Sequence, residues 1–312
     1  MRLLRERSSR KLKANEENAV VIQLFINGIS MGAVYAIVAV GFALVFSILR
    51  FSNFAHGGII SVCAYAVFFF QKMFDKLPNI FVLMAVSALF GALITLLLDL
   101  VGFMSIRRNN SPRIYYFVSS ITFGILAENV LSVRYGAFVL VFPHIFEVSS
   151  FTLFGLSFST LDMFTLATTI VLLAALMVFI QKTKLGLAIR TVSIDPMTSN
   201  LMGINSAVVI TSTFMIAGML AGIGGVLLAT RYSVYPTLGS GMIAKAFIAS
   251  VIGGLGSLSG AILGSILLGV VEMYLVYFFG SSVTTVLLLV IMIVFLILRP
   301  QGISGVQVQD KA

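Results

Sequence analysis

The sequence has very little charge for its length. Charged residues make up 10% of the 312 residues, hydrophobic residues make up 59%, and the mean hydropathy is +1.10. A water-soluble domain of this size exposes far more charge than this. The composition therefore excludes an ordinary globular protein and indicates a core bounded by lipid.

Cysteine, tryptophan and histidine are scarce or missing. Cys63 is the only cysteine, which excludes disulfide scaffolds and cysteine-based zinc sites. Two histidines are too few for a credible metal site. Tryptophan is absent, so tyrosines and long basic side chains must anchor the chain at the membrane interface.

Signatures of catalysis and of nucleotide binding are missing as well. The sequence has no GxxxxGK[ST] phosphate loop, no nucleophile–base pair and no paired carboxylates. We therefore expect a non-catalytic protein that needs no cofactor and does not hydrolyse ATP itself. The net charge of +9 does not indicate nucleic-acid binding, because the basic residues lie between apolar runs.

Long apolar runs dominate what is present. A bilayer-crossing helix needs roughly 20 such residues, and only helices satisfy their backbone in hydrocarbon without a barrel pattern. We predict an all-α polytopic integral membrane protein with about eight or nine transmembrane helices, some of them broken. The candidate spans are 22–48, 53–72, 80–104, 115–135, 160–181, 207–231, 241–258, 259–280 and 283–299. The predicted organisation is a basic tail 1–20, a single membrane domain 21–305 and a C-terminal tail 306–312.

Basic residues orient these spans. Lys and Arg gather in the connectors 105–114 and 182–206, whereas 136–159 and 232–240 carry none. The positive-inside rule places the first two in the cytoplasm together with 300–312, and the other two outside. The N-terminus conflicts with this scheme, because three spans before Arg107 would leave a basic tail outside. Either the tail breaks the rule or one early segment does not cross.

The predicted external connector 136–159 is long and apolar. Loops of this length in compact proteins are usually functional. It could cap a transport pathway or dock an extracytoplasmic partner, and a packed loop without a partner is the alternative.

Two glycine- and serine-rich breaks interrupt the apolar helices, at 47–58 and 253–260. Irregular backbone at membrane depth is tolerated where it lines a cavity or is buried in protein, and such breaks mark pathways in transporters. Ordinary connectors with close helix packing are the alternative. The residues expected to line or support a transport pathway are Ser47, Asn53, His56, Ser257 and Ser259.

Acidic residues are few within the spans. Glu128 and Glu272 are predicted to lie deep, whereas Asp99 and Asp162 fall near span ends. No span holds a closely spaced acidic pair, which argues against ion-driven transport. Lys245 is expected to snorkel to the outer interface.

The segment 182–206 is the largest polar connector. Asp195-Pro196 predicts a helix start and Gly203 a stop, so we expect a short cytoplasmic helix within 186–204 that binds a soluble partner. Arg190 offers a permanently charged fork, and Met202 an apolar anchor. The residues assigned to this contact are Gly186, Arg190, Asp195, Met197, Leu201, Gly203 and Ile204.

Several of these runs together resemble one family. They are NFAHG at 53–57, GLAIRTVSID at 186–195, KAFIASVIGGLGSLSGAILG at 245–264 and RPQG at 299–302. Together they are similar to the first permease subunit of the branched-chain amino acid type of ABC transporter. The resemblance covers about 20–305.

The resemblance implies a set of partners. These are a second permease subunit, two ATP-binding subunits beneath the membrane, an extracytoplasmic substrate-binding protein and membrane lipids, in the cytoplasmic membrane of a prokaryote. It implies that 186–204 docks on the ATPase and that Met104 and Ser105 replace a common Arg-Pro pair. Permeases for urea, amides or other small solutes are alternatives within the family. An ion-coupled secondary transporter and a membrane-embedded enzyme are alternatives of other classes.

Overall fold

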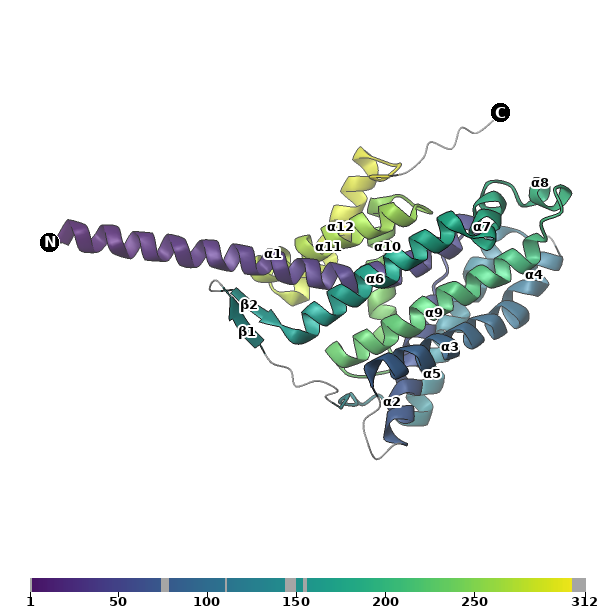
Figure 1. Ribbon diagram of the computed structural model, residues 1–312, viewed down its shortest axis with the longest axis horizontal. Coiled ribbons are helices and arrows are strands. Elements are labelled where there is room, and N and C mark those ends of the chain that lie inside the picture. Colours follow the sequence, from purple (N-terminus) through teal and green to yellow (C-terminus); the bar gives the residue numbers. More distant parts are fainter. Residues whose placement is uncertain (1, 74–78, 110, 144–149, 154–155, 305–312) are drawn as a thin grey trace.

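The computed structural model describes residues 2–73, 79–109, 111–143, 150–153 and 156–304 (Figure 1). Helices dominate these residues, as the sequence predicts. The elements are α1 (Arg2–Leu49), α2 (Ala55–Lys72), α3 (Ile80–Leu98), the π-helix η1 (Asp99–Phe103), α4 (Met104–Arg108), α5 (Arg113–Tyr135), β1 (Ser150–Leu153), β2 (Leu156–Ser159), α6 (Thr160–Lys182), α7 (Lys184–Ile194), α8 (Pro196–Leu201), α9 (Ser206–Tyr232), α10 (Leu238–Gly253), α11 (Leu258–Phe279) and α12 (Ser281–Leu298).

Seven helical stretches in the described part of the chain are long and apolar enough to cross a membrane. They are Ala19–Leu49 of α1, Ile80–Arg108 across α3 to α4, and the whole of α5, α6, α9, α11 and α12. Two predicted spans fall short of this criterion. Polar residues at both ends lower the hydropathy of α2, and α10 has only 16 residues. Both still form helices, and both are largely buried among their neighbours.

Helix α1 runs through the centre of the bundle. Every hydrophobic residue from Ala33 to Val45 exposes 3% or less of its surface, so no side of this segment faces lipid. Small residues bring α1 against α11. A Cβ atom added at Gly28 or Gly32 would lie 2.6 Å from the backbone of Val270 or Ile266, respectively. Glycine at these two positions permits the close approach of α1 and α11.

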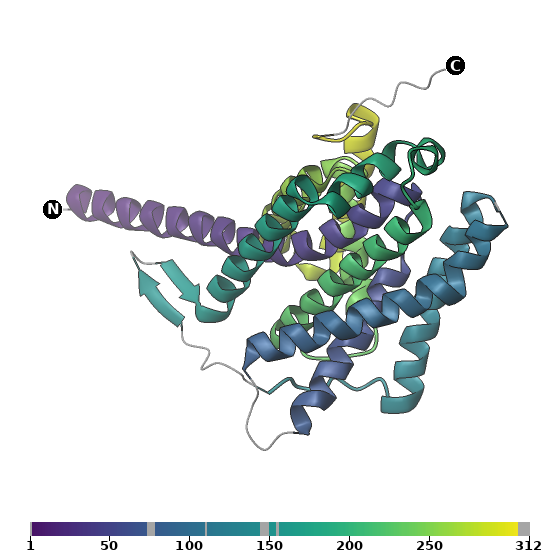
Figure 2. The same cartoon turned by 45° about the vertical axis from the view of Figure 1, so that its right-hand side comes forward.

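A second close contact joins α3 to α9, which run alongside each other in Figure 2. Gly218 and Gly222 of α9 face the backbone of α3, and the Ser87 hydroxyl donates to the Gly222 carbonyl at 2.7 Å. Glycine permits this approach because any larger side chain would collide with the facing backbone.

The bundle has two distinct ends (Figure 1). Helices α4, α7 and α8 lie at one, which we call the coupling end, and β1 and β2 lie at the other, the hairpin end. Arg50, just after α1, donates to the Ser193 carbonyl at the coupling end, at 3.2 Å. Gln23, near the other end of the α1 span, exchanges hydrogen bonds with the Ser157 backbone at the hairpin end, each 2.8 Å. Helix α1 therefore crosses the whole bundle.

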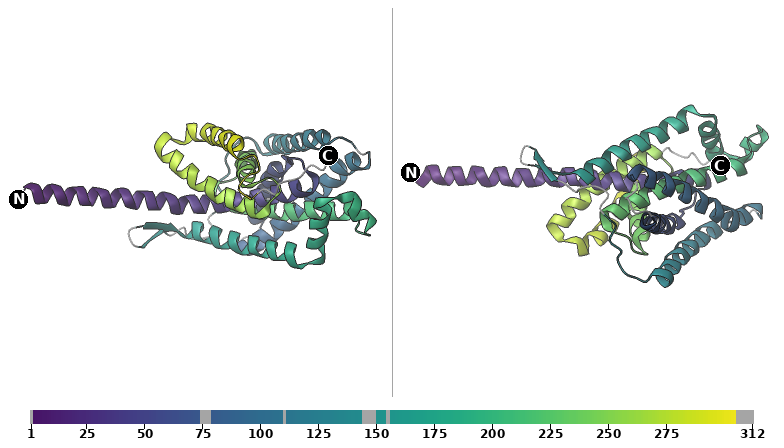
Figure 3. Two further views of the ribbon diagram at one scale, coloured as in Figure 1. Left: turned by 90° about the horizontal axis from the view of Figure 1, so that it is seen from above. Right: turned by 60° about the horizontal axis from the view of Figure 1, so that its bottom comes forward.

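This placement bears on the conflict at the N-terminus. The predicted tail is continuous with the first span in α1, and its helix projects beyond the hairpin end in both views of Figure 3. The tail thus lies at the end assigned to the outside, as the first alternative, a tail that breaks the charge rule, requires, and the side of the membrane stays a prediction. The predicted C-terminal tail 306–312 lies outside the described residues.

The hairpin end is built from the predicted external connectors. Strands β1 and β2 pair antiparallel, with Ser150 opposite Ser159 and Leu153 opposite Leu156. Leu140 and Val234 form an isolated antiparallel bridge, with N–O distances of 2.8 and 2.9 Å. The two connectors expected on one side of the membrane therefore meet at one end of the molecule.

Candidate functional site

The coupling segment, residues 182–206, forms two capped helices. The Thr183 hydroxyl accepts from the Gly186 N–H at 3.0 Å and begins α7. The Asp195 carboxylate accepts from the Met197 N–H at 2.9 Å and begins α8, with Pro196 in its first turn. Gly203 follows α8 with a φ of +84°, the left-handed conformation that ends a helix. The predicted start and stop of a helix at these residues are confirmed.

The expectation of one helix within 186–204 is wrong. The segment forms two helices, α7 and α8, which are separated at Asp195. Asp195 has an extended backbone, with φ −152° and ψ 106°. The ring of Pro196 disfavours a helical conformation at the residue before it and removes one N–H donor. The same dipeptide that starts α8 therefore ends α7.

Apolar side chains crowd the free surface of this segment. The predicted anchors Met197, Leu201 and Met202 are 77%, 82% and 76% exposed, and Ile194, which the sequence analysis did not single out, is 84% exposed. Ile194 is the last residue of α7, and its exposure could not be predicted because the sequence did not show that α7 ends there. Four large apolar side chains left open on a polar connector indicate a contact surface rather than a solvated loop.

The remaining predicted residues position this surface. Gly186 lies so close to the Ile180 carbonyl that an added Cβ would be 2.3 Å away, so it permits the tight turn from α6 into α7. Arg190 is exposed, and its Nη2 donates to the Gln181 carbonyl at 3.4 Å. The Ile204 N–H donates to the Ser199 carbonyl at 3.0 Å and leads the chain into α9.

The inner face of the coupling segment is attached to the bundle. Ile189 and Val192 of α7 are buried, at 2% and 0% exposure. The Arg50 guanidinium holds the Ser193 carbonyl from the end of α1, and Arg50 itself has a φ of +54°. A displacement of α7 therefore reaches α1, the central helix, directly.

The serines predicted for a pathway gather at the coupling end. A Cβ added at Gly256 would lie 3.4 Å from the Ser47 Cα, so the two glycine- and serine-rich breaks touch. Ser257 caps α11 by accepting from the Gly260 N–H at 3.1 Å, and its hydroxyl is 3.4 Å from that of Ser259. Ser47 donates to the Leu44 carbonyl at 2.7 Å.

Asn53 and His56 lie apart from these serines, inside the subunit. Their exposures are 2% and 1%, and the His56 ring packs against Gly41 of α1. Within the described residues, Asn53 Oδ1 and His56 Nε2 have no hydrogen-bond partner. Both side chains are therefore enclosed by the subunit in this structure. Their predicted role in transport stays a prediction.

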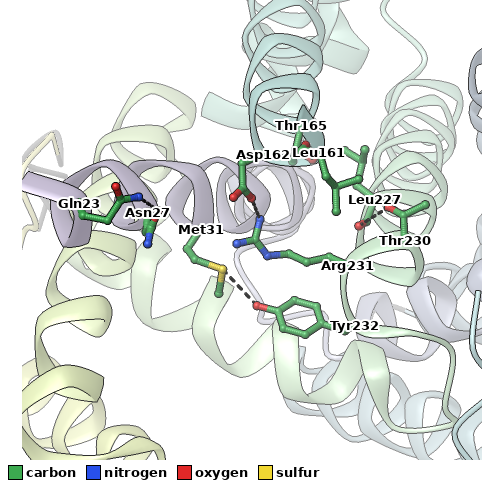
Figure 4. A network of polar contacts seen from close by, with 10 residues as sticks. All are labelled: Gln23, Asn27, Met31, Leu161, Asp162, Thr165, Leu227, Thr230, Arg231 and Tyr232. Carbon is green, nitrogen blue, oxygen red and sulfur yellow. Dashed lines mark hydrogen bonds and ion pairs between the residues drawn. The ribbon is translucent and has the colours of Figure 1, made fainter. Parts of the chain in front are cut away.

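Three of the acidic residues form ion pairs, and the partners of the first two, Asp99 and Asp162, are arginines. Asp99 is fully buried at the π-helix, where Arg107 binds both of its oxygens and Thr211 of α9 donates to Oδ2 at 2.5 Å. Asp162 pairs with Arg231 of α9 near the hairpin end (Figure 4). Glu128 lies against Ser240 of α10.

The third pair corrects the expectation for Lys245. Its ammonium does not snorkel outward but lies 2.6 Å from Glu272 Oε1 and 3.0 Å from the Tyr35 hydroxyl. Tyr35 donates to Glu272 Oε2 at 2.8 Å. A buried carboxylate on α11 offers a nearer partner for the ammonium than the membrane interface does. No local sequence pattern predicts this pairing, because it depends on how α1, α10 and α11 are rotated about their axes.

Comparison with known proteins fits this arrangement. Residues 24–297 match the model of a family described as branched-chain amino acid transport system / permease component. The chain belongs to this family. It is 31% identical over 295 residues to the high-affinity branched-chain amino acid transport system permease protein BraD of Pseudomonas aeruginosa, across 91% of this chain and 95% of that protein.

Two further relatives also match over most of their length. Escherichia coli LivH, a permease protein of the same kind of system, is 29% identical over 303 residues, 93% of this chain and 97% of its own. A probable LivH of Methanocaldococcus jannaschii is 30% identical over 283 residues, 86% and 88% of the two chains. The protein is therefore a multi-pass component of a transport system in the plasma membrane.

Proposed function

We propose that this protein is the permease subunit of an importer whose ATP is bound and hydrolysed by separate subunits, and that its cargo is branched-chain amino acids. The observation that carries the proposal is the coupling segment, with its two capped helices, four exposed apolar side chains and exposed arginine. Apolar anchors on one face of short helices are suited to docking in a groove of a partner. The partner in this proposal is the ATPase subunit.

The attachment of α7 to α1 supplies a mechanism. A partner drives a conformational change only if it binds the two states unequally. An ATPase dimer that holds α7 and α8 differently when closed and open would move α7 against Arg50 and hence the end of α1. The proposed consequence is that the pathway beside α1 opens to one side at a time.

The remaining partners follow from the exposed surfaces. The most apolar window of α12 is only 11% buried within the chain, which leaves room for lipid or for a second permease subunit. An extracytoplasmic binding protein would meet the hairpin end. The cargo is proposed from the relatives named above, which are permease proteins of branched-chain amino acid transport.

The ion-coupled transporter is the less favoured alternative. Such a protein needs membrane carboxylates that are free to take up and release a cation. In the described residues Asp99, Asp162 and Glu272 are each neutralised by a basic partner. The structure thus offers few carboxylates for that role.

Reconstitution tests the proposal. The chain is assembled in liposomes with its second permease, ATPase subunits and binding protein, and uptake of labelled leucine, isoleucine, valine and urea is measured with and without ATP. We expect ATP-dependent uptake of the three amino acids only. Arg190→Glu should abolish both uptake and cargo-stimulated ATP hydrolysis, because it reverses the charge presented to the partner.

The matched control is Lys182→Glu, an equal change of charge at an exposed residue of α6 outside the apolar surface. This variant should retain most of the uptake. Uptake without ATP, or Arg190→Glu with normal coupling, would contradict the proposal, and uptake of urea alone would contradict the cargo.

A further inference from the structure

The most unusual group outside the coupling segment is a charged cluster in the middle of the bundle. Tyr35, Lys245 and Glu272 come from α1, α10 and α11, and each contacts the other two within 3.0 Å. Tyr35 is fully buried, but the side chains of Lys245 and Glu272 remain 19% and 9% exposed. The ion pair is therefore desolvated but not sealed.

A purely structural role explains this cluster poorly. Burying an ion pair in a low-dielectric interior contributes little net stability, because the desolvation cost offsets the attraction. Ionisable residues within membrane helices therefore mark functional sites by default. Lys245 also has acceptors for only two of its three N–H donors within the described residues. The Lys245 side chain is partly exposed, and its ammonium group can donate to one more anionic partner.

A polar stripe leads from the hairpin end to this cluster. Gln23, Asn27, Met31 and Tyr35 follow each other at intervals of four residues along α1. Figure 4 shows the first three of them. Gln23 bonds to Asn27 at 3.0 Å, and the Tyr232 hydroxyl donates to Met31 Sδ at 3.1 Å. Beyond Tyr35 toward the coupling end, α1 is apolar as far as Phe46. The stripe thus ends at the charged cluster.

The outer part of the stripe opens into a cavity of about 240 Å³ between α1, α6 and β2. Its polar lining includes Asn27, Ser157 and Asp162, and its apolar lining includes Ile26 and Met163. Asp162 in turn holds Arg231 (Figure 4). A small solute that is charged at one end and apolar at the other fits this lining.

We propose that Lys245, Glu272 and Tyr35 form an intramembrane binding site for the charged ends of a zwitterionic α-amino acid, reached through this cavity and stripe. The carboxylate of the cargo binds the Lys245 ammonium, and the ammonium group of the cargo binds the Glu272 carboxylate. The cargo thus inserts into the ion pair and replaces each lost contact with one of equal charge. Tyr35 holds the Glu272 carboxylate in place. The inference rests on the proposed function and adds the residues that recognise the cargo.

The test uses the complete reconstituted transporter and L-leucine. Lys245→Met and Glu272→Gln remove one charge each and keep the length of the side chain. We expect leucine moved per ATP hydrolysed to fall at least about tenfold, the size of a lost charge-assisted hydrogen bond to a ligand. Stimulation of ATP hydrolysis by the loaded binding protein should remain, because the coupling segment is untouched. The matched control is Lys72→Met, which changes an exposed lysine of α2 that lies over the Phe68 ring. This variant should leave the ratio of leucine to ATP unchanged.

A charge-reversed double variant separates recognition from packing. Lys245→Glu with Glu272→Lys restores an ion pair, so thermal stability should recover, but leucine per ATP should stay low because the acid and the base now stand in the reverse order for the carboxylate and the ammonium group of the cargo. Full recovery of both, or normal transport by the single variants, would overturn the site. If Lys245→Met does not assemble, Lys245→Gln and Tyr35→Phe replace it, and an unchanged ratio in both also overturns the site.

Two failures are distinguishable. A wild-type complex that hydrolyses ATP without moving leucine contradicts the proposed function together with this site. Single variants that match a working wild type contradict the site alone.

Discussion

At the scale of single residues, Asp195 organises the coupling segment. Its carboxylate accepts from the Thr198 hydroxyl and from the Met197 N–H, and it faces water on every other side. These hydrogen bonds, the one from Thr198 first, lower the pKa of the Asp195 carboxyl below its ordinary value of 3.8. A pKa lowered by folding means that the cap is at full strength above 3.8 and is lost as the pH falls through the folded value.

We therefore expect the α8 cap to be independent of pH from 8 to 5. Hydrogen-exchange protection of the Met197 amide, corrected for intrinsic rates, should stay constant over this range. Asp195→Ala should remove the protection at every pH, and Asp195→Asn, which also caps helices, should keep it. Protection that declines between pH 8 and 5 would show that another group holds the start of α8.

Sequence reasoning succeeded where a residue acts on its own neighbours. The cap at Asp195 and the stop at Gly203 depend on backbone chemistry within a few positions, which the sequence displays. It failed for Lys245, whose partners are 27 and 210 residues away along the chain. The pair of Arg107 and Asp99 is intermediate in sequence separation. The two residues are eight positions apart in one helical stretch, so the sequence could have suggested this pair.

At the scale of elements, backbone contact between α3 and α9 fixes the bundle. A Cβ at Gly222 would lie 2.1 Å from the Ser87 carbonyl oxygen, whereas at Gly224 the nearest atom would be 3.5 Å away, on the Ile37 side chain. Hydropathy predicted most of these helices, but not which of them pack through glycine. That choice depends on helix rotation, which a nearly uniform apolar sequence does not encode.

This difference yields a matched pair of variants. Alanine has a helix propensity about 1 kcal/mol more favourable than glycine, so Gly224→Ala should leave the melting temperature of the purified protein equal or higher. Gly222→Ala should lower it clearly, since the α3 backbone must move away and the Ser87 hydrogen bond is lost. Equal melting temperatures for the two variants would contradict the close approach of these helices.

At the scale of the whole molecule, the two ends carry different functions. The coupling end presents exposed apolar helices, and the hairpin end presents the cavity, the strands and the N-terminal part of α1. The distribution of Lys and Arg grouped the connectors at the same two ends as the structure does. It did not decide at which end the N-terminal tail lies. The contact of Gln23 with Ser157 decides its end, because it ties the start of the α1 span to the hairpin.

Cysteine labelling tests this arrangement in intact cells. In a Cys63→Ala background, Arg10→Cys should react with a membrane-impermeant maleimide from outside, and Lys184→Cys should react only after permeabilisation. Cys63 is fully buried, so its removal should not change the accessibility of other sites. Protection of Arg10→Cys in intact cells would place the tail inside and contradict the crossing of α1.

The most direct test of the central claim is the binding of the ATPase subunit to the coupling segment. The double variant Met197→Glu, Leu201→Glu changes two exposed side chains, and Phe138→Glu, at a residue 76% exposed near the hairpin end, is the control. Co-purification of the ATPase with the membrane subunits is measured in detergent for both. We predict that the double variant loses the ATPase while its membrane part stays folded, and that the control retains it. An ATPase that stays bound to the double variant as tightly as to the wild type would contradict the claim.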